Sequence, residues 1–582
     1  MFNGKITCER NAQIVITLMK EYGVKKIVTS PGTMNVCLIA SIQNDPFFEI
    51  YSAPEERSAA YMACGIAAES GEKVALTCTG ATASRNYMPG LTEAYYRKLP
   101  ILAITCSKKS MYIGHNIEQV TDRTLLPRDV ARISVQANYV TDADTEWQCE
   151  IACNKAFLEL SNKGGGPVHI NLETMTSKEF VDNVKPVKVI KKYSKDSAFP
   201  EIKAKSVAVL IGSHVRWTSE LTNVVDEFCE KYNGAVLCDQ TSNYKGKYGI
   251  YHSLLMAQHN YIPKLSQVEL AIYIGNVSAA NFNISSIETW RVNDDGEIRD
   301  INKKVSSIFE TSEYNFFNYY IKSENGASAM SYYKICKMEV DKVNALIPEL
   351  PFSSFWIASK YANSFPDGSS VHYGIRNSQR AFSYFEAPKN IYCCSNTGGF
   401  GIDGCISSAI GASLVINEKL CFCILGDLAF FYDINSLGNR HINNNLRIIL
   451  LNNGTGMELN FTDSFPGILG VDRDTYIAAT GHYGHKSKDL VKHYASDLGY
   501  LYLSADSKES FDVCMKLMTS DSLDKSVICE VFIDKKDDDD AYYAITRLMS
   551  SRLENVKHEL KGGLSKIVGT KGKKVIKDLL GE

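Results

Sequence analysis

Two short apolar runs in the last third of the chain constrain its fold most. Residues 421–425 (CFCIL) precede Gly426-Asp427, and residues 447–451 (RIILL) precede Asn452-Asn453. Both runs have the length and continuity of strands buried in a parallel sheet. The segment between them is long enough for the helical crossover that a parallel pair requires. The sequence therefore predicts an α/β sheet that brings an acid and an amide to one edge.

The side chains at this edge would suit a hard cation. Asp427 and Asn453 supply carboxylate and amide oxygens, which Mg²⁺ binds together with phosphate oxygens and water. A purely structural interpretation stays open, because Asn-Asn-Gly is an ordinary turn sequence. A motif elsewhere in the chain has to decide between the two.

A second motif runs from Ser52 to Gly71, after the apolar run 47–51. Its apolar positions are small or aliphatic and form a helix face that could pack closely on a sheet: Ala59, Ala60, Met62, Ala63, Ile66 and Ala67. Glu55 and Glu56 lie where strand meets helix, and the usual role of such a residue is a helix cap. Residues 74–78 and 99–105 predict two further strands.

Together these motifs resemble those of thiamine-diphosphate-dependent enzymes. Such enzymes place a glutamate at a strand–helix junction, nine residues before a helix glycine, and a distant Gly-Asp and Asn-Asn pair follows. Glu56 has this spacing to Gly65, whereas Glu55 does not. The resemblance implies that Glu56 hydrogen-bonds N1′ of the aminopyrimidine and so promotes loss of the thiazolium C2 proton.

A narrower resemblance is to the menaquinone-pathway synthase that joins 2-oxoglutarate to isochorismate. Residues 396–404 (NTGGFGIDG) and 426–435 (GDLAFFYDIN) are similar to that branch, which also has leucine at the position of Leu428. Asn377-Ser378 matches its segment near the diphosphate. The likeness is strong over roughly residues 25–105 and 370–460, and it is faint between them.

The resemblance implies thiamine diphosphate and Mg²⁺ as cofactors. The side chains of Asp427 and Asn453 and the carbonyl of Thr455 would bind the metal. Besides Glu56, Asp427 and Asn453, the implied cofactor-binding residues are Thr79, Gly80, Asn86, Asn377, Ser378, Gly426, Leu428 and Met457. His115 falls where the family's first-domain loop faces the thiazolium, and it is expected to be catalytic like Glu56, although a surface role is equally open.

The implied reaction is decarboxylation of a 2-oxo acid, followed by transfer of the acyl-anion equivalent to an acceptor or to a proton. The synthase branch reads its substrates with arginines, and three of these are replaced here, by Met34, Thr397 and Phe382. Arg376 and Arg380 stand nearby but out of register. We therefore expect an acceptor other than isochorismate. Further candidates for substrate contact are Lys108 and Arg123, each more typical of a surface residue.

Three alternatives stay open at this point. The chain could be the menaquinone-pathway synthase with a rebuilt pocket, or an enzyme like acetolactate synthase, which uses pyruvate. It could also be a cofactor-binding scaffold that has lost catalysis. Retention of Glu56, Asp427 and Asn453 argues against the scaffold.

Composition fits a large enzyme without nucleic-acid binding. The chain has 582 residues, enough for about three domains, and a net charge of −3. It has no apolar stretch of about 18 residues and no amino-terminal secretory pattern, so we expect a cytoplasmic protein. The 17 cysteines are scattered without a Cys-x-x-Cys pair, which favours reduced thiols over a zinc site.

We expect three doubly wound α/β domains: a pyrimidine-binding domain at 1–185, a central domain at 186–350, and a domain for diphosphate and Mg²⁺ at 351–535. Residues 536–582 contain an acidic run and a basic amphipathic helical tail. Such a tail could bind a membrane surface or a partner, or it could be a terminal helix exposed to solvent. In the resembled superfamily two subunits build each site, so a homodimer or homotetramer is expected.

Overall fold

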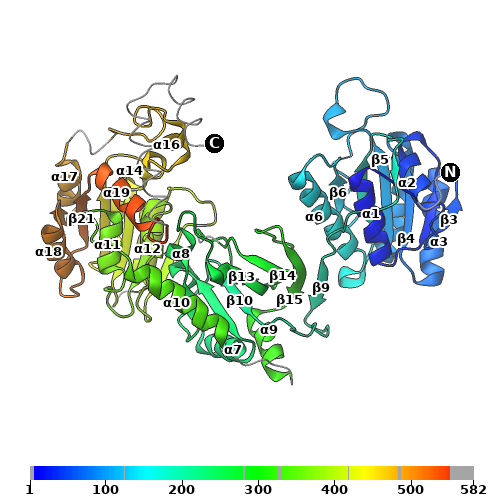
Figure 1. Cartoon of the computed structure of the whole chain (residues 1–582). Coiled ribbons are helices and arrows are strands. Elements are labelled where there is room, and N and C mark those ends of the chain that lie inside the picture. The colour runs from blue at the N-terminus through cyan, green and yellow to red at the C-terminus, as the bar shows by residue number, and fades with distance from the viewer. Residues whose placement is uncertain are drawn as a thin grey trace, which may run out of the picture. The chain divides into compact units, whose positions relative to one another are not determined.

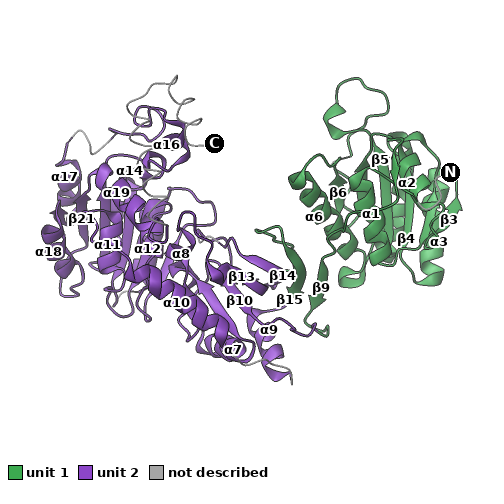
Figure 2. Cartoon of the chain, viewed as in Figure 1, with its two compact units in different colours: residues 1–198, 295–310 green, residues 199–294, 311–582 purple. Residues whose placement is uncertain are grey.

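A computed structural model describes residues 5–123, 125–279, 282–323, 330–416, 418–482 and 487–550. The chain forms two compact units (Figure 2). Unit 1 comprises residues 1–198 and 295–310, and unit 2 comprises residues 199–294 and 311–582. The predicted basic segment, residues 561–582, lies outside the described residues.

Unit 1 contains a six-stranded parallel sheet in the order β3-β2-β4-β5-β7-β6 (Figure 1). Its strands are β2 (Lys26–Thr29), β3 (Glu49–Ser52), β4 (Val74–Thr79), β5 (Ile101–Ser107), β6 (Ser134–Ala137) and β7 (Val168–Glu173). Its helices are α1 (Arg10–Glu21), α2 (Val36–Ile42), α3 (Glu56–Ser70), α4 (Thr82–Asn86), α5 (Met88–Arg97) and α6 (Ala143–Glu159). Two strand pairs complete it: antiparallel β1 (Ile6–Thr7) with β8 (Phe180–Val181), and parallel β9 (Lys191–Ser194) with β15 (Val305–Glu310).

Small side chains let α3 pack closely in this unit. Ala59, Ala60 and Ala63 are buried, and a Cβ added to Gly90 on α5 would lie 2.5 Å from the Cβ of Ala60. Met62, which we expected on the same face, is exposed, because the buried positions follow helical spacing and residue 62 lies off that stripe. The close packing fixes the helix whose first residue is Glu56.

Unit 2 contains two parallel arrays of strands. The first has the order β12-β11-β10-β13-β14, formed by β10 (Val207–Ile211), β11 (Gly234–Cys238), β12 (Gly249–Tyr251), β13 (Gln267–Ile274) and β14 (Ser285–Asn293). Its helices are α7 (Ser219–Lys231), α8 (Ser253–Met256), α9 (Glu313–Lys322) and α10 (Ser331–Ala345).

The second array is a six-stranded sheet in the order β17-β16-β18-β19-β21-β20. Its strands are β16 (Ser370–Tyr373), β17 (Tyr392–Ser395), β18 (Cys421–Gly426), β19 (Leu446–Asn452), β20 (Leu501–Ala505) and β21 (Val527–Phe532). The surrounding helices are α11 (Ser354–Tyr361), α12 (Asn377–Ser383), α13 (Cys405–Val415), α14 (Asp427–Tyr432), α15 (Met457–Asn460), α16 (Phe465–Leu469), α17 (Leu490–Asp497), α18 (Lys508–Met518) and α19 (Lys535–Ile545).

The predicted pair of buried parallel strands is confirmed. Strands β18 and β19 lie side by side, with Gly426 opposite Leu451, and both are buried. The α/β class of several parallel sheets with flanking helices is confirmed as well. The domain boundaries at residues 185, 350 and 535 stay predictions. Among the described residues, no helix is both long and apolar enough to cross a membrane.

A buried polar cluster on β7 makes the stability of unit 1 depend on pH. The two ring nitrogens of His169 lie 2.8 Å from the hydroxyl oxygens of Thr105 and Ser134. Burial lowers the pKa of His169 to about 3, and the charge of Arg123 adds to this effect. The folded chain therefore holds this imidazole neutral at pH values where an unfolded chain protonates it.

We expect His169→Gln to flatten the acid side of the stability profile. The unfolded imidazole titrates near pH 6.5, so the contribution of His169 is complete above that pH and is lost progressively as the pH falls toward 3. About 2 kcal/mol of it disappears by roughly pH 5. Thermal unfolding of both proteins from about pH 5 to 8 measures the difference. Parallel profiles for wild type and variant would contradict the assignment.

Candidate active site

A cavity of about 590 Å³ lies at the carboxyl edge of the sheet formed by β16–β21. It is lined by all eight residues predicted for this half of the site: Asn377, Ser378, Gly426, Asp427, Leu428, Asn453, Thr455 and Met457. Open α/β sheets bind their ligands at this edge, beyond the carboxyl ends of the strands. The fold thus brings together residues that lie far apart in the sequence.

Asp427 is a buried carboxylate at the first position of α14. Burial raises its pKa to about 7, although the backbone amides of Leu428 and Gly454 favour the charged form. Among the described residues, no lysine or arginine forms an ion pair with Asp427. A buried acid without a cationic partner is costly, and a bound cation would compensate it.

Asn453 has its amide oriented by its neighbours. Its Nδ2 donates to Oδ2 of Asp538 over 3.0 Å, and its Oδ1 accepts from the backbone N–H of Thr455 over 3.3 Å. Because the amide nitrogen is engaged with Asp538, the amide oxygen is the atom left for a ligand. The buried hydroxyl of Thr455 lies 2.7 Å from the hydroxyl of Thr480.

Asp538 on α19 escaped prediction. It is fully buried, and it accepts hydrogen bonds from the backbone N–H and hydroxyl of Ser354, at 2.7 and 3.1 Å. Nδ2 of Asn377 lies 3.5 Å from the same carboxylate, which also binds Asn453. Asp538 thus links two predicted site residues to the carboxyl-terminal helix.

The sequence showed residues 537–540 only as an acidic run, and the structure separates the buried Asp538 from its neighbours in that run. The signal was helical spacing, because Asp538, Ala541 and Ile545 form the buried face of α19. Oδ1 of Asn377, at the rim of the cavity, is buried and has no hydrogen-bond partner among the described residues. An unpaired acceptor beside a buried carboxylate fits a site that awaits a ligand.

We expect Asp538→Asn to weaken Mg²⁺ binding by about 10- to 100-fold, the usual cost of losing a residue that orients a metal ligand. The new amide would present a donor to side chains that already donate, so Asn453 would turn. Asp540→Asn on the same helix is the control, since Asp540 is exposed and pairs with Lys536. Calorimetric Mg²⁺ titration with thiamine diphosphate present is the measurement. Equal affinities in both variants would refute the positioning role.

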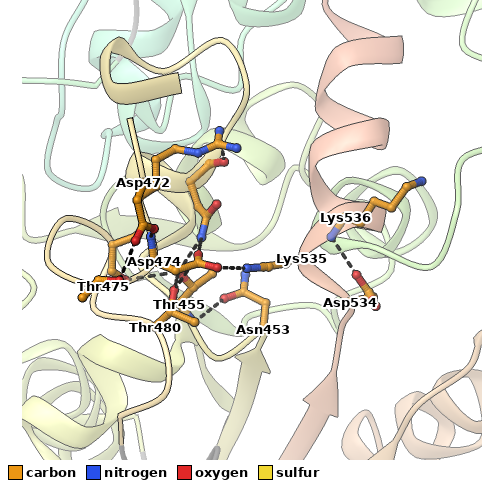
Figure 3. Close-up of polar contacts among 12 residues, drawn as sticks. Asn453, Thr455, Asp472, Asp474, Thr475, Thr480, Asp534, Lys535 and Lys536 are labelled. Atoms are coloured by element: carbon orange, nitrogen blue, oxygen red, sulfur yellow. Dashed lines mark hydrogen bonds and ion pairs between the residues drawn. The ribbon is translucent and has the colours of Figure 1, made fainter. Parts of the chain in front are cut away.

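A polar network fastens the loop that follows Asn453 (Figure 3). Asp474 accepts from Nδ2 of Asn460 and the hydroxyl of Thr480, at 2.9 and 3.0 Å, and from Nζ of Lys535 at 2.6 Å. The hydrogen bond from Lys535 is the main reason that the pKa of Asp474 falls to about 2. Asn460 also donates to the hydroxyl of Thr455. The network ties the candidate metal loop to the start of α19.

The arginines near the cavity differ from those of the resembled branch. Phe382 lies in the hydrophobic core, whereas Arg376 and Arg380, which are out of register, line the cavity. Both guanidinium Nη atoms of Arg380 lie 2.7 Å from the carboxylate oxygens of Glu458. Met34 and Thr397 are buried. Cationic side chains therefore reach this cavity from positions that family comparison would not select.

In unit 1 the two adjacent glutamates have separate roles. Glu55 caps α3, and its carboxylate accepts from the backbone N–H groups of Arg57 and Ser58 at 3.1 and 2.8 Å. The carboxylate of Glu56 instead accepts from Nδ2 of Asn86 at 3.1 Å. Because the cap is supplied by Glu55, the side chain of Glu56 is left for another task.

Two more predicted residues lie at the end of β4: Thr79 is its last residue, and Gly80 begins the turn that follows. A Cβ on Gly80 would lie 3.1 Å from the carbonyl oxygen of Cys106, so the backbone passes closely here. The next residue, Ala81, has φ 62° and ψ −137°, and the guanidinium of Arg123 donates to its carbonyl. The expectation that Arg123 lies at the surface is wrong, because it is buried and holds the strained turn, whereas its contact with substrate stays a prediction.

His115 and Lys108 lie at the surface of unit 1. His115 is exposed in the loop after the short 3₁₀ helix η2 (Ser110–Tyr112), and its backbone N–H donates to the carbonyl of Tyr112. Lys108 donates to the carbonyl of Glu118. The catalytic role of His115 stays a prediction.

The sequence of this chain is similar to those of known proteins. Residues 10–126 match the family model described as "Thiamine pyrophosphate enzyme, N-terminal TPP binding domain". A 2-succinyl-5-enolpyruvyl-6-hydroxy-3-cyclohexene-1-carboxylate synthase of Bacteroides fragilis is 27% identical over 563 residues, covering 91% of this chain and 97% of that protein. The synthase of Flavobacterium johnsoniae is 28% identical over 76% of this chain and 83% of its own.

The synthase of Porphyromonas gingivalis is 24% identical over 90% of this chain and 94% of its own. The matches extend through the central region, where the resemblance in sequence motifs was faint. The chain is therefore similar to thiamine-diphosphate-dependent enzymes, and its similarity to the menaquinone-pathway synthase branch covers most of its length.

Proposed function

We propose that the chain is a Mg²⁺-dependent synthase that uses thiamine diphosphate to decarboxylate a 2-oxo acid and transfers the remaining acyl group to an acceptor. The three relatives described above are named as synthases, which favours transfer to an acceptor over simple decarboxylation. The observation that carries the proposal is the cavity at the edge of β18 and β19, where every residue predicted for metal and diphosphate binding in this half of the site meets.

The donor set fits the metal and the cofactor. Asp427 and Asn453 would hold Mg²⁺ through side-chain oxygens, and Thr455 through its carbonyl. Asn377 and Ser378 line the same cavity and would face the diphosphate, to which the hydroxyl of Ser378 could donate. When bound, the cofactor supplies a carbon nucleophile for the keto group and accepts the electron pair that CO₂ leaves behind.

The chain's own residues would control a proton on the cofactor and would exclude water from the site. Glu56, aimed by Asn86, would hold a proton at N1′ of the aminopyrimidine. The apolar side chains of Leu428, Leu451 and Met457 line the cavity and would keep water from the reacting carbon. Premature protonation would turn a synthase into a decarboxylase, so this apolar lining favours transfer.

The same site makes a non-catalytic scaffold the weaker alternative. Asp427 and Asp538 are both buried without a cationic partner among the described residues. Retaining two such carboxylates costs stability, and a chain that had lost its metal would gain by replacing them. A cofactor-binding active site gives both carboxylates a use.

We propose that the enzyme is a homodimer or homotetramer. Glu56 lies in unit 1 and Asp427 in unit 2, and in the resembled superfamily such halves come from different subunits. Beside the cavity, α16 exposes Phe465, Ile468 and Leu469 by 75%, 75% and 59%. Exposed apolar side chains of this extent are typical of a subunit interface. Light scattering of the full chain would show a monomer if the proposal is wrong.

The test of the reaction is product analysis. The full chain, with thiamine diphosphate and Mg²⁺, is incubated with 2-oxoglutarate and isochorismate, each alone and together. The names of the relatives favour the synthase alternative over the changed acceptor that the replaced arginines suggested, so we expect CO₂ release and a product mass that joins both substrates. Pyruvate with a second pyruvate as acceptor is the comparison, and acetolactate formation would favour that alternative. A free aldehyde as the sole product would contradict the synthase proposal.

A further inference from the structure

A second cavity of about 380 Å³ adjoins the first within unit 2. The two share Arg376, Arg380 and Tyr542. Two arginines and no acidic residue are among the described residues that line this second cavity. A cavity whose lining carries excess positive charge attracts an anion.

The charges of the two arginines are balanced unequally. Arg380 makes a two-pronged ion pair with Glu458, with both contacts at 2.7 Å. The guanidinium of Arg376 reaches the same carboxylate only at 3.8 Å, and its side chain is 53% exposed. One carboxylate therefore serves two guanidinium groups, and Arg376 is left with donors for a ligand.

The backbone at Arg376 is strained. It has φ 68° and ψ −119°, a conformation that glycine adopts readily and other residues avoid. Phe400, whose ring lies 5.5 Å from this guanidinium, also has a positive φ, of 53°. Backbone strain of this kind persists only where the surrounding structure fixes the residue, and it is concentrated at ligand-binding positions.

An unpaired hydroxyl belongs to another residue that lines the second cavity. Ser253, at the start of α8, is 7% exposed and lines the second cavity. Its Oγ is buried and has no hydrogen-bond partner among the described residues. Buried hydroxyl groups are nearly always paired, so an orphan that faces a cavity indicates a missing acceptor.

From these observations we infer that the second cavity is a subsite for a carboxylate, bound by Arg376 and Ser253, and that Arg376 sets substrate specificity. The inference rests on the proposed function for the reacting end of the molecule. With the keto group of a 2-oxo acid in the first cavity, a second carboxylate would extend to Arg376. Arg376, which lies outside the positions that the synthase branch uses, would thus distinguish a 2-oxo dicarboxylic acid from pyruvate as the donor.

Binding of glutarate to the full chain without cofactors tests the subsite independently of catalysis, because glutarate has two carboxylates and no keto group. We expect calorimetry to detect binding to wild type, a loss of at least tenfold in Arg376→Gln, and a smaller loss in Ser253→Ala. Arg216→Gln is the matched control, since Arg216 is exposed, stacks on Tyr392 at 4.6 Å and lines neither cavity.

Arg376→Gly separates binding from folding. Glycine tolerates the backbone conformation at this position, so this variant should unfold at a higher temperature than wild type and still lose glutarate. Glutarate binding to Arg376→Gln within twofold of wild type would overturn the inference, as would no binding to wild type. Binding of inorganic phosphate without glutarate would overturn the carboxylate assignment.

Kinetics then distinguishes failure of the subsite from failure of the proposed function. With an active enzyme, Arg376→Gln should raise KM for 2-oxoglutarate at least tenfold and change kcat little. An unchanged KM in an active variant removes the subsite and leaves the proposed function standing. If glutarate binding depends on Arg376 but the chain decarboxylates no 2-oxo acid, the subsite stands and the proposed function is removed.

Discussion

Glu56→Gln is expected to lower turnover by about 10²- to 10⁴-fold, the usual worth of a positioned acid–base group. Glutamine can still accept a hydrogen bond from Asn86, but it cannot hold a proton at N1′ of the aminopyrimidine. Thiamine diphosphate affinity should change little, because the metal and diphosphate contacts come from other residues. Steady-state kinetics and cofactor titration by fluorescence quenching measure the two effects separately.

Glu55→Gln is the matched control, one position away. Glu55 caps α3 through the backbone N–H groups of Arg57 and Ser58, so this variant should melt at a slightly lower temperature and keep most of its turnover. Full turnover in Glu56→Gln, or an equal loss in both variants, would remove Glu56 from the chemistry.

Asp427→Ala is expected to abolish Mg²⁺-dependent cofactor binding, with an affinity loss of more than about 100-fold. The carboxylate is the only charged group among the three expected metal ligands, and Mg²⁺ binds neutral oxygens alone weakly. The cofactor-free variant should be at least as stable as wild type, because the change removes a buried acid that has no cationic partner among the described residues.

Thermal unfolding with and without thiamine diphosphate and Mg²⁺ measures both effects in one experiment. Wild type should gain several degrees on adding the cofactors, and Asp427→Ala should gain none. Asp540→Ala, which loses only an exposed ion pair with Lys536, should gain as much as wild type. Equal stabilisation of all three proteins would refute the metal assignment.

The strands that carry the site could be predicted because parallel strands buried on both faces read as continuous apolar runs. Residues 421–425 and 447–451 are such runs, and β18 and β19 cover them. Polar residues directly after such strands meet at one edge, so Asp427 and Asn453 followed without knowledge of the rest of the fold.

Residues that act through burial could not be predicted in the same way. Asp538 sits in a run of four aspartates, and only its position on the buried face of α19 separates it from its neighbours. Arg123 is a single cation in a loop, where nothing local distinguishes a surface residue from one that holds the Ala81 turn. Such roles depend on contacts between distant segments.

The arginines show a third limit of prediction from sequence. Position 382 aligns with a substrate-binding residue of the synthase branch, but Phe382 packs in the core, and Arg376 and Arg380 supply the charge at the cavities instead. A comparison of aligned positions registers the loss of an arginine and overlooks its replacement a few residues away. Only the fold shows that charge is retained at the site.

The most direct test of the central claim is CO₂ release from a panel of 2-oxo acids, with thiamine diphosphate and Mg²⁺ each present and absent. The panel comprises 2-oxoglutarate, pyruvate and phosphonopyruvate, with and without isochorismate. We predict release from 2-oxoglutarate that needs both cofactors and falls by about 10²- to 10⁴-fold in Glu56→Gln. No release from any acid by a chain that demonstrably binds thiamine diphosphate, or release that needs neither cofactor, would contradict the account.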